Sequence, residues 1–291
     1  MVYIFICVDF DRDYAFPIVG LKHAISKPIQ LKSSKEQSLN PIESISIKGT
    51  VNCFNPFMTY LSDKELQTTF YFEARSAKLF SEKYPKEMKM FKKSSFEFGV
   101  HGYDHEDFTG EETRVRFEQD EERNIIASAK REIENLFSTD IVGFRAPYMR
   151  ITSNTLQILS ALNFTHDSSY YKEAERAIYP FRIKEGLVEF PVIKTPKESS
   201  MKGMYTYLWS FFEKKRTLEE IIGNYIHLLK NTEDKNSYIS INLHLWHFAY
   251  NIEHNRFLLQ EEIAENIHSF KKLITSLEKC ENVTFSTPSE W

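Results

Sequence analysis

The chain of 291 residues lacks several features that would place it in a familiar class of protein. Its three cysteines, Cys7, Cys53 and Cys280, lie far apart and form no CxxC pair. This pattern excludes a disulfide framework and a thiolate zinc site as organising features, and it favours reduced cysteines. No run of apolar residues approaches the roughly 18 to 20 that a membrane span requires. We therefore expect a protein with no membrane span.

An excess of basic residues is also missing. The chain has 37 Lys and Arg against 41 Asp and Glu, which gives a net charge of −4. Nucleic-acid binding normally leaves a basic footprint, so we expect no nucleic-acid partner. Residues 1–13, MVYIFICVDFDRD, lack the basic start and the small-residue cleavage site of a signal peptide. We interpret them as a strand and expect a cytoplasmic protein, and no pattern indicates its oligomeric state.

What the sequence does contain is the pattern of an α/β protein. Short β-rich apolar runs alternate with helical patterns, which is typical of parallel strands joined by crossover helices. We expect strands at 2–8, 68–74, 96–100, 140–144, 164–168, 187–192, 238–244 and 282–287. We expect helices within 120–137, 152–163, 217–230 and 258–279. Without a linker or an internal repeat, residues 1–291 are interpreted as a single domain.

Two stretches fit no regular repeat and are interpreted as long loop excursions. Residues 14–50 hold three prolines and show little periodicity, and residues 194–216 form the second excursion. Loops of this length in a compact domain are often functional lids. The aromatic side chains of the second stretch, including Tyr205, Tyr207 and Trp209, are of a kind that stacks on sugar faces, but we favour packing as their role.

Chemically capable side chains gather where predicted strands end. In a barrel of parallel strands, the loops at the carboxyl ends converge on one face and build the active site. The candidates at these ends are Asp9, Asp11, Asp13, His101, His105, Arg145, Asp167, His244 and His247. Each has a structural alternative, which is a solvated turn, a surface salt bridge or a buried core histidine. Their coincidence at several strand ends favours a functional site.

The spacing of the acids and histidines indicates a metal site. The three acids of residues 9–13 are two apart, so they share one side of an extended chain. His101 and His105 are four apart and can share one face of a helical turn. Two histidines and one carboxylate leave a position open for water on a tetrahedral metal, which is the catalytic arrangement.

These motifs resemble those of the polysaccharide deacetylases, the NodB-homology domains of carbohydrate esterase family 4. The family has an acidic motif after the first strand, then H-[ST]-x-x-H, R-x-P-[YF], an Asp-containing motif and a late histidine motif. Here they read VDFDRD, HGYDH, RAPY, HDSS and LHLWHF, in the same order. The resemblance spans residues 3 to about 287. It implies a distorted (β/α) barrel of about seven parallel strands, similar to a TIM barrel.

The resemblance also implies roles for individual residues. His101, His105 and one Asp of the first motif would bind one divalent metal, with zinc as our first choice and cobalt, nickel, manganese or iron as alternatives. A second Asp would act as general base, oriented by Arg145. The backbone N–H of Tyr148 would stabilise the oxyanion, and His244, held by Asp167, would protonate the leaving group. Pro147, Tyr148 and Trp246 are the expected substrate contacts.

The first motif departs from the usual adjacent acids, T-F-D-D, because this chain reads D-F-D-R-D. One alignment makes Asp9 the base and Asp11 the ligand. The other makes Asp11 the base and Asp13 the ligand. We prefer the first because Asp9 directly ends the apolar run, and we keep Asp13 and His247 as second-line candidates.

The expected function is metal-dependent removal of an N-acyl group, in the first place N-acetyl, from an amino sugar or glycan precursor. Two alternatives stay open. The same fold could hydrolyse a non-sugar amide such as a cyclic ureide, or a lipid-linked formamido sugar. The chain could also be a catalytically silent barrel that only binds carbohydrate.

Overall fold

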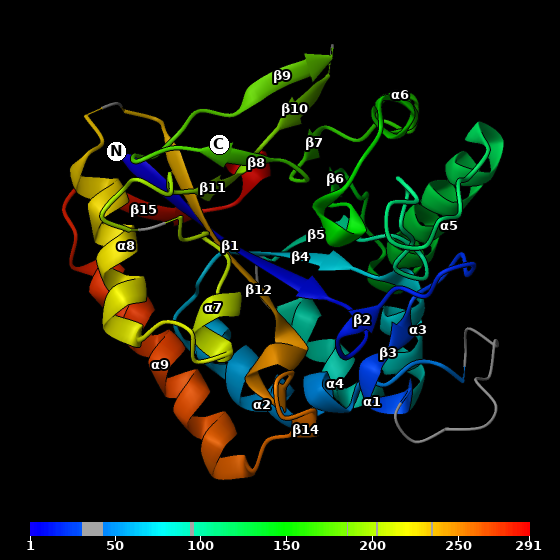
Figure 1. The fold of residues 1–291 in the computed structure, drawn as a ribbon, viewed down its shortest axis with the longest axis horizontal. Helices are drawn as coiled ribbons and strands as arrows, with labels where there is room; N and C mark the ends of the chain where they lie inside the picture. Colours follow the sequence, from blue (N-terminus) through cyan, green and yellow to red (C-terminus); the bar gives the residue numbers. More distant parts are fainter. Residues whose placement is uncertain (31–42, 94–95, 185, 202, 234) are drawn as a thin grey trace.

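A nine-stranded sheet forms the centre of the molecule in the computed structural model (Figure 1). The structure describes residues 1–30, 43–93, 96–184, 186–201, 203–233 and 235–291. Within these residues, the sheet order is β12 (Tyr238–His244), β1 (Val2–Phe10), β4 (Thr68–Phe72), β5 (Glu97–Val100), β6 (Gly143–Phe144), β7 (His166–Asp167), β10 (Leu187–Glu189) and β9 (Phe181–Lys184). A further strand, β15 (Val283–Ser286), pairs with β1. The pairings are parallel except that of β9 with β10.

Strand β1 pairs with three other strands, β12, β4 and β15, and its side chains are almost all buried. Such a run suits a parallel strand that is covered on both faces. Residues Val2 to Phe5 pair with β15 and Ile6 to Phe10 pair with β4, while β12 pairs with β1 from Tyr3 to Asp9. The carboxyl end of β1 is therefore surrounded by neighbouring strands, and Asp9 lies beside His244 of β12.

Helices cover the sheet. They are α1 (Lys27–Gln30), α2 (Lys48–Asp63), α3 (Ala74–Lys83), α4 (Pro85–Met88), α5 (Gln119–Phe137), α6 (Ser153–Ala161), α7 (Trp209–Phe212), α8 (Leu218–Lys230) and α9 (Gln260–Glu278). Helices α8 and α9 lie side by side along one flank, and α3 packs against α5 on another (Figure 1). Short elements complete the described chain: β2 (Ala15–Phe16), β3 (Ile25–Ser26), β8 (Tyr171–Glu173), β11 (Val192–Lys194), β13 (Tyr250–Asn251), β14 (Arg256–Phe257), η1 (Lys89–Lys93), η2 (Pro147–Met149), η3 (Leu245–Phe248) and η4 (Pro288–Glu290).

The predicted fold class, a distorted barrel of parallel strands with helices, is confirmed. The predicted helix starts also hold at α6 and α8, where Thr152 and Thr217 form capping boxes with Thr155 and Glu220. None of the helices in the described ranges combines the length and apolarity that a bilayer crossing requires.

The two predicted loop excursions contain regular structure. Residues 31–42 of the first lie outside the described residues, but its last part begins α2 at Lys48, so the expected loop to residue 50 is too long. In the second, α7 forms, and a segment before it pairs with β12. Leu208 donates its backbone N–H to the Asn242 carbonyl at 2.8 Å, and the Asn242 N–H donates to the Thr206 carbonyl at 2.9 Å. This segment therefore lies along β12 and brings its side chains to the carboxyl end of the sheet.

Candidate active site

Six of the nine candidate residues predicted at strand ends meet at the carboxyl end of the sheet: Asp9, Asp11, His101, His105, Arg145 and His244. Asp9 is the second-last residue of β1, and His244 ends β12 in register with it. His101 follows β5, and its backbone N–H donates to the Phe72 carbonyl at 2.7 Å. Arg145 follows β6, and its backbone N–H donates to the Val100 carbonyl at 2.9 Å. These bonds extend the strand ladders, so the side chains beyond them are held on one face.

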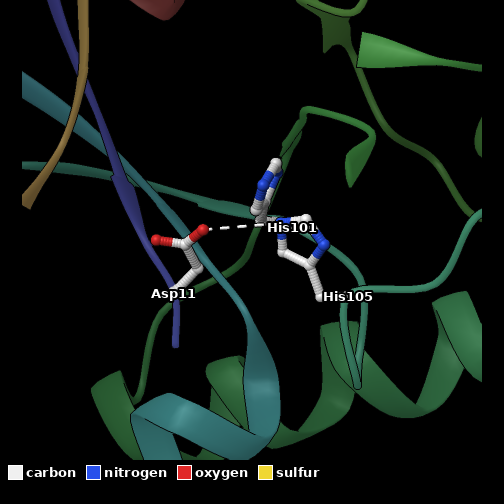
Figure 2. Close-up of side chains that lie close together, drawn as sticks. All are labelled: Asp11, His101 and His105. Atoms are coloured by element: carbon white, nitrogen blue, oxygen red, sulfur yellow. Dashed lines mark ion pairs between the residues drawn. The ribbon is translucent and has the colours of Figure 1, made fainter. Parts of the chain in front are cut away.

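Asp11, His101 and His105 form a buried cluster with the composition of a metal site (Figure 2). One ligand atom from each lies within 4.8 Å of the others. Among the described residues, Asp11 Oδ1, His101 Nε2 and His105 Nδ1 are buried and have no hydrogen-bond partner. Buried polar atoms are normally paired, so the unpaired atoms of Asp11 and His101 require an explanation. His105 completes the cluster through its other ring nitrogen, Nε2, which lies 3.4 Å from Asp11 Oδ2. A divalent ion fits them.

The ring of His101 is prepared for metal binding. Its Nδ1 lies 2.8 Å from the Arg145 carbonyl oxygen, which can only accept, so Nδ1 carries the proton and Nε2 keeps its lone pair. Burial lowers the pKa of His101 to about 4, so the ring is neutral near pH 7. A neutral imidazole is the form that binds a metal.

Asp13 does not join this cluster. Its carboxylate accepts backbone N–H bonds from Gly49 at 2.9 Å and Thr50 at 3.3 Å, and the Ser46 hydroxyl donates to it at 2.6 Å. Asp13 therefore caps the first turn of α2, where Ile47 offers no capping side chain. The structure supports Asp11 over Asp13 as the acidic ligand, and the second-line assignment of Asp13 is wrong.

Asp9 has the surroundings of a carboxylate base. It is buried, and Arg145 Nη1 donates to its Oδ1 at 3.0 Å. Burial opposes ionisation, but the charges of Arg145, His101 and His244 outweigh it and hold the pKa of Asp9 below its usual range. Asp9 is therefore ionised at neutral pH and can accept a proton from a water molecule in the cavity.

Arg145 is itself fixed on several sides. Its guanidinium donates to the Ser168 carbonyl at 3.1 Å, to the Ser168 hydroxyl at 2.9 Å and to Asn242 Oδ1 at 2.7 Å. It also lies 4.4 Å from the centre of the Tyr71 ring. Because these bonds fix the orientation of the guanidinium group, Arg145 presents one defined N–H to Asp9.

The expected contact between His244 and Asp167 is absent. His244 Nδ1 lies 3.1 Å from Asp11 Oδ2. Asp167 accepts a bond from the Ser169 hydroxyl at 2.6 Å and shares a buried carboxyl pair with Glu189. The short strand β7 directs Asp167 toward β10, away from β12, so the prediction that Asp167 holds His244 is wrong. Burial lowers the pKa of His244, but the charges of Asp11 and Asp9 and the hydrogen bond with Asp11 together outweigh it, and the net shift is upward.

Tyr207 is a site residue that the sequence interpretation assigned to packing. Its hydroxyl donates to Asp9 Oδ2 and lies 3.3 Å from His244 Nε2. Burial raises the pKa of Tyr207 well above its usual value, so the hydroxyl keeps its proton. The only signal in the sequence was the position of Tyr207 in an aromatic-rich excursion, which gives no register relative to β12.

Buried ion pairs fix the loop that carries His101 and His105. Arg12 is fully buried and pairs with Glu73 and with Asp104, which is 3.2 Å away, and Arg75 also binds Asp104. Gly102 has φ +74°, and a Cβ there would lie 2.6 Å from Glu106 Oε2. This explains why glycine occupies a position where the family pattern has Ser or Thr.

A cavity of about 690 Å³ opens above the cluster. Its lining combines the site residues with aromatic side chains and a few polar groups: Asp9, Asp11, His101, His105, His244, Tyr14, Phe16, Tyr148, Tyr171, Tyr205, Tyr207, Trp209, Trp246, Arg150, Glu112 and Lys215 among others. Such a size and lining suit a small ligand or one to two sugar rings.

The expected substrate contacts divide into two groups. Tyr148 and Trp246 line the cavity, whereas Pro147 is buried beside Gly102 and does not line it. His247 is also buried, and its Nε2 lies 2.6 Å from Glu213 Oε1. His247 therefore belongs to the packing around α7, and its second-line assignment is wrong.

Comparison with known proteins supports the predicted resemblance. Residues 48–166 match the family model of polysaccharide deacetylase. A peptidoglycan deacetylase-like protein of Gibberella zeae is 33% identical over 88 residues. That match covers 30% of this chain and 24% of the relative, so it spans about a quarter of the relative's length.

Solved structures share the fold over nearly the whole chain. A protein from Mycobacterium smegmatis assigned to the polysaccharide deacetylases has a TM-score of 0.62 at 16% identity, covering 99% of this chain and 88% of its own. The Puue allantoinase has a TM-score of 0.63 at 13% identity, with coverages of 99% and 88%. In sequence over residues 48–166 and in fold over almost its whole length, the chain resembles the polysaccharide deacetylases, as its motifs predicted.

Proposed function

We propose that the protein is a metal-dependent hydrolase that removes an N-acyl group, in the first place N-acetyl, from an amino sugar or glycan precursor. The observation that carries the proposal is the pairing of two features at one point. The buried ligand set of Asp11, His101 and His105 lies beside Asp9, a carboxylate that Arg145 keeps ionised. The family-model match supports the same chemistry.

The residues would divide the reaction as follows. Asp11, His101 and His105 would hold one divalent ion, with zinc as first choice, which when bound lowers the pKa of water and polarises the acyl carbonyl. Asp9 takes the proton of the attacking water, and Arg145 keeps its carboxylate ionised and oriented. The backbone N–H of Tyr148 would donate to the developing oxyanion. His244 returns a proton to the leaving amine.

The aromatic lining supports a sugar substrate. Tyr148, Trp209 and Trp246 surround the cavity with flat apolar faces and carry polar edges, which suits the alternating faces and hydroxyl groups of a sugar ring. The fold is shared with an allantoinase, so a ureide is the second substrate class to test. The single domain and the cytoplasmic location remain predictions.

The test combines a metal assay with a substrate screen. Purified protein should hold about one divalent ion per chain and should release acid from N-acetylated amino sugars faster than from N-formylated sugars or cyclic ureides. His101→Ala should lose both metal and turnover. Asp9→Asn should keep the metal and bind substrate without turnover. Full activity of the metal-free protein would refute the proposal, and substrate binding without turnover in the wild type would favour the silent barrel.

A further inference from the structure

Tyr207 contacts the candidate base from the side opposite to Arg145. Arg145 Nη1 donates to Asp9 Oδ1, and the Tyr207 hydroxyl donates to Asp9 Oδ2. Each carboxylate oxygen therefore receives one donor from a different part of the chain. Only 8% of Tyr207 is exposed, so solvent cannot readily replace its hydroxyl.

One residue fixes both donors. Asn242 of β12 accepts from Arg145 Nη2 at 2.7 Å through its Oδ1. Its Nδ2 donates to the Thr206 carbonyl at 2.9 Å, and its backbone pairs with Thr206 and Leu208 on either side of Tyr207. The position of Tyr207 relative to Arg145 is therefore set by β12, which pairs with β1 along its whole length, and not by a free loop.

Two donors on opposite oxygens restrict rotation of the carboxylate group. With Arg145 alone, Asp9 could turn about its terminal torsion, which is broad for this side chain. With both donors, the plane of the carboxylate is defined, and the lone pairs left over face a fixed direction in the cavity. A general base must lie within hydrogen-bond reach of the proton that it removes, so this orientation affects the rate.

We propose that Tyr207 is a positioning residue for Asp9, and that it forms with Arg145 a two-sided clamp set by Asn242. The inference rests on the proposed function, because it assigns Asp9 as the base. It distinguishes Tyr207 from the other aromatic residues of the cavity wall, which would contact substrate. A clamp acts on turnover, whereas a wall residue acts on substrate affinity.

The experiment compares Tyr207→Phe with Tyr225→Phe. Tyr225 is buried, and its hydroxyl donates to the carbonyls of Thr206 at 3.2 Å and Ser240 at 3.4 Å, so it supports the same segment without touching Asp9. A hydrogen bond to a charged group contributes enough that Tyr207→Phe should lower kcat about 10- to 100-fold. KM should stay within about twofold of the wild-type value, since the substitution removes no contact that binds the substrate. Metal content and melting temperature should match those of Tyr225→Phe, which should keep kcat.

A second measurement does not depend on turnover. The Tyr207 hydroxyl proton should appear in the wild-type proton NMR spectrum as a slowly exchanging downfield signal, remain in Tyr225→Phe and vanish in Tyr207→Phe. Absence of this signal from the wild type, unchanged kcat in Tyr207→Phe, or an equal loss of kcat in Tyr225→Phe would each overturn the clamp. If the wild type turns over no substrate, the proposed function fails, and the signal alone then decides whether the contact exists.

Discussion

Replacing Asp13 and replacing Asp11 should have opposite effects on stability and on metal binding. In Asp13→Ala, the N–H groups of Gly49 and Thr50 lose their acceptor at the buried start of α2. A buried donor without a partner costs about 1–3 kcal/mol, and loss of a helix cap typically costs about 1 kcal/mol. These effects overlap, so we expect a loss of about 2–4 kcal/mol in the free energy of unfolding, which is roughly 3–7 °C in melting temperature for a chain of this length.

Asp11 makes no such bonds, since its described contacts are with His105 at 3.4 Å and His244 at 3.1 Å. Asp11→Ala should lose the metal and change the melting temperature of the metal-free protein less than Asp13→Ala does. Both variants are measured by thermal unfolding in chelator and by elemental analysis after metal loading. Asp13→Asn is the matched control, because its amide oxygen still accepts one N–H. The reasoning is refuted if Asp13→Ala loses the metal at unchanged stability while Asp11→Ala retains it.

Three further predictions concern Arg145, the buried carboxyl pair and the metal. Arg145→Lys keeps the charge but loses the hydrogen bonds to Ser168 and Asn242, so steady-state kinetics should show kcat lower by about 100-fold. A near-normal kcat would show that the several N–H donors of the guanidinium are not required. Burial raises the pKa of Asp167 to about 6 and that of Glu189 well above its usual range. The pair therefore contributes stability that is complete below the unfolded-state pKa, about 4. The contribution of Asp167 is lost as pH rises through 6, and that of Glu189 is lost at higher pH. In urea unfolding from acid to neutral pH, the wild type should lose stability relative to Glu189→Gln as pH rises, and a constant difference would contradict the raised pKa values. Chelation should lower the melting temperature of the wild type, because it removes about 2.7 kcal/mol of stabilisation if free metal had been 100 times its Kd. The melting temperature of His101→Ala should not change on chelation, and equal responses of the two proteins would refute the ligand assignment.

The sequence predicted the site residues that strands deliver directly. Asp9, His101 and Arg145 end or follow apolar runs, and parallel strands place such positions at one edge whatever the exact register. Asp167 shows the limit of this reasoning. It also lies at a strand end, but β7 has two residues and lies several strands from β12, so adjacency to His244 could not be read from the pattern.

Helix α2 and Tyr207 were missed because their determinants are far away in the chain. The start of α2 has glycine and no local capping residue, and its cap comes from Asp13, 36 residues from Gly49. Tyr207 reaches Asp9 because the segment around it pairs with Asn242, a contact that leaves no periodic signal in residues 194–216. Local sequence patterns predict the strands and the metal-binding motif. The helix cap at Asp13 and the contact of Tyr207 with Asp9 depend on hydrogen bonds between residues far apart in the sequence.

The most direct test of the account is acetate release from an N-acetylated amino-sugar oligomer by metal-loaded wild type and Asp9→Asn, with the metal content of each sample determined in parallel. We predict about one divalent ion per chain in both proteins, with turnover in the wild type alone. Equal turnover in the two proteins, or turnover by wild type that holds no metal, would contradict the assignment of Asp9 as base beside a metal held by Asp11, His101 and His105.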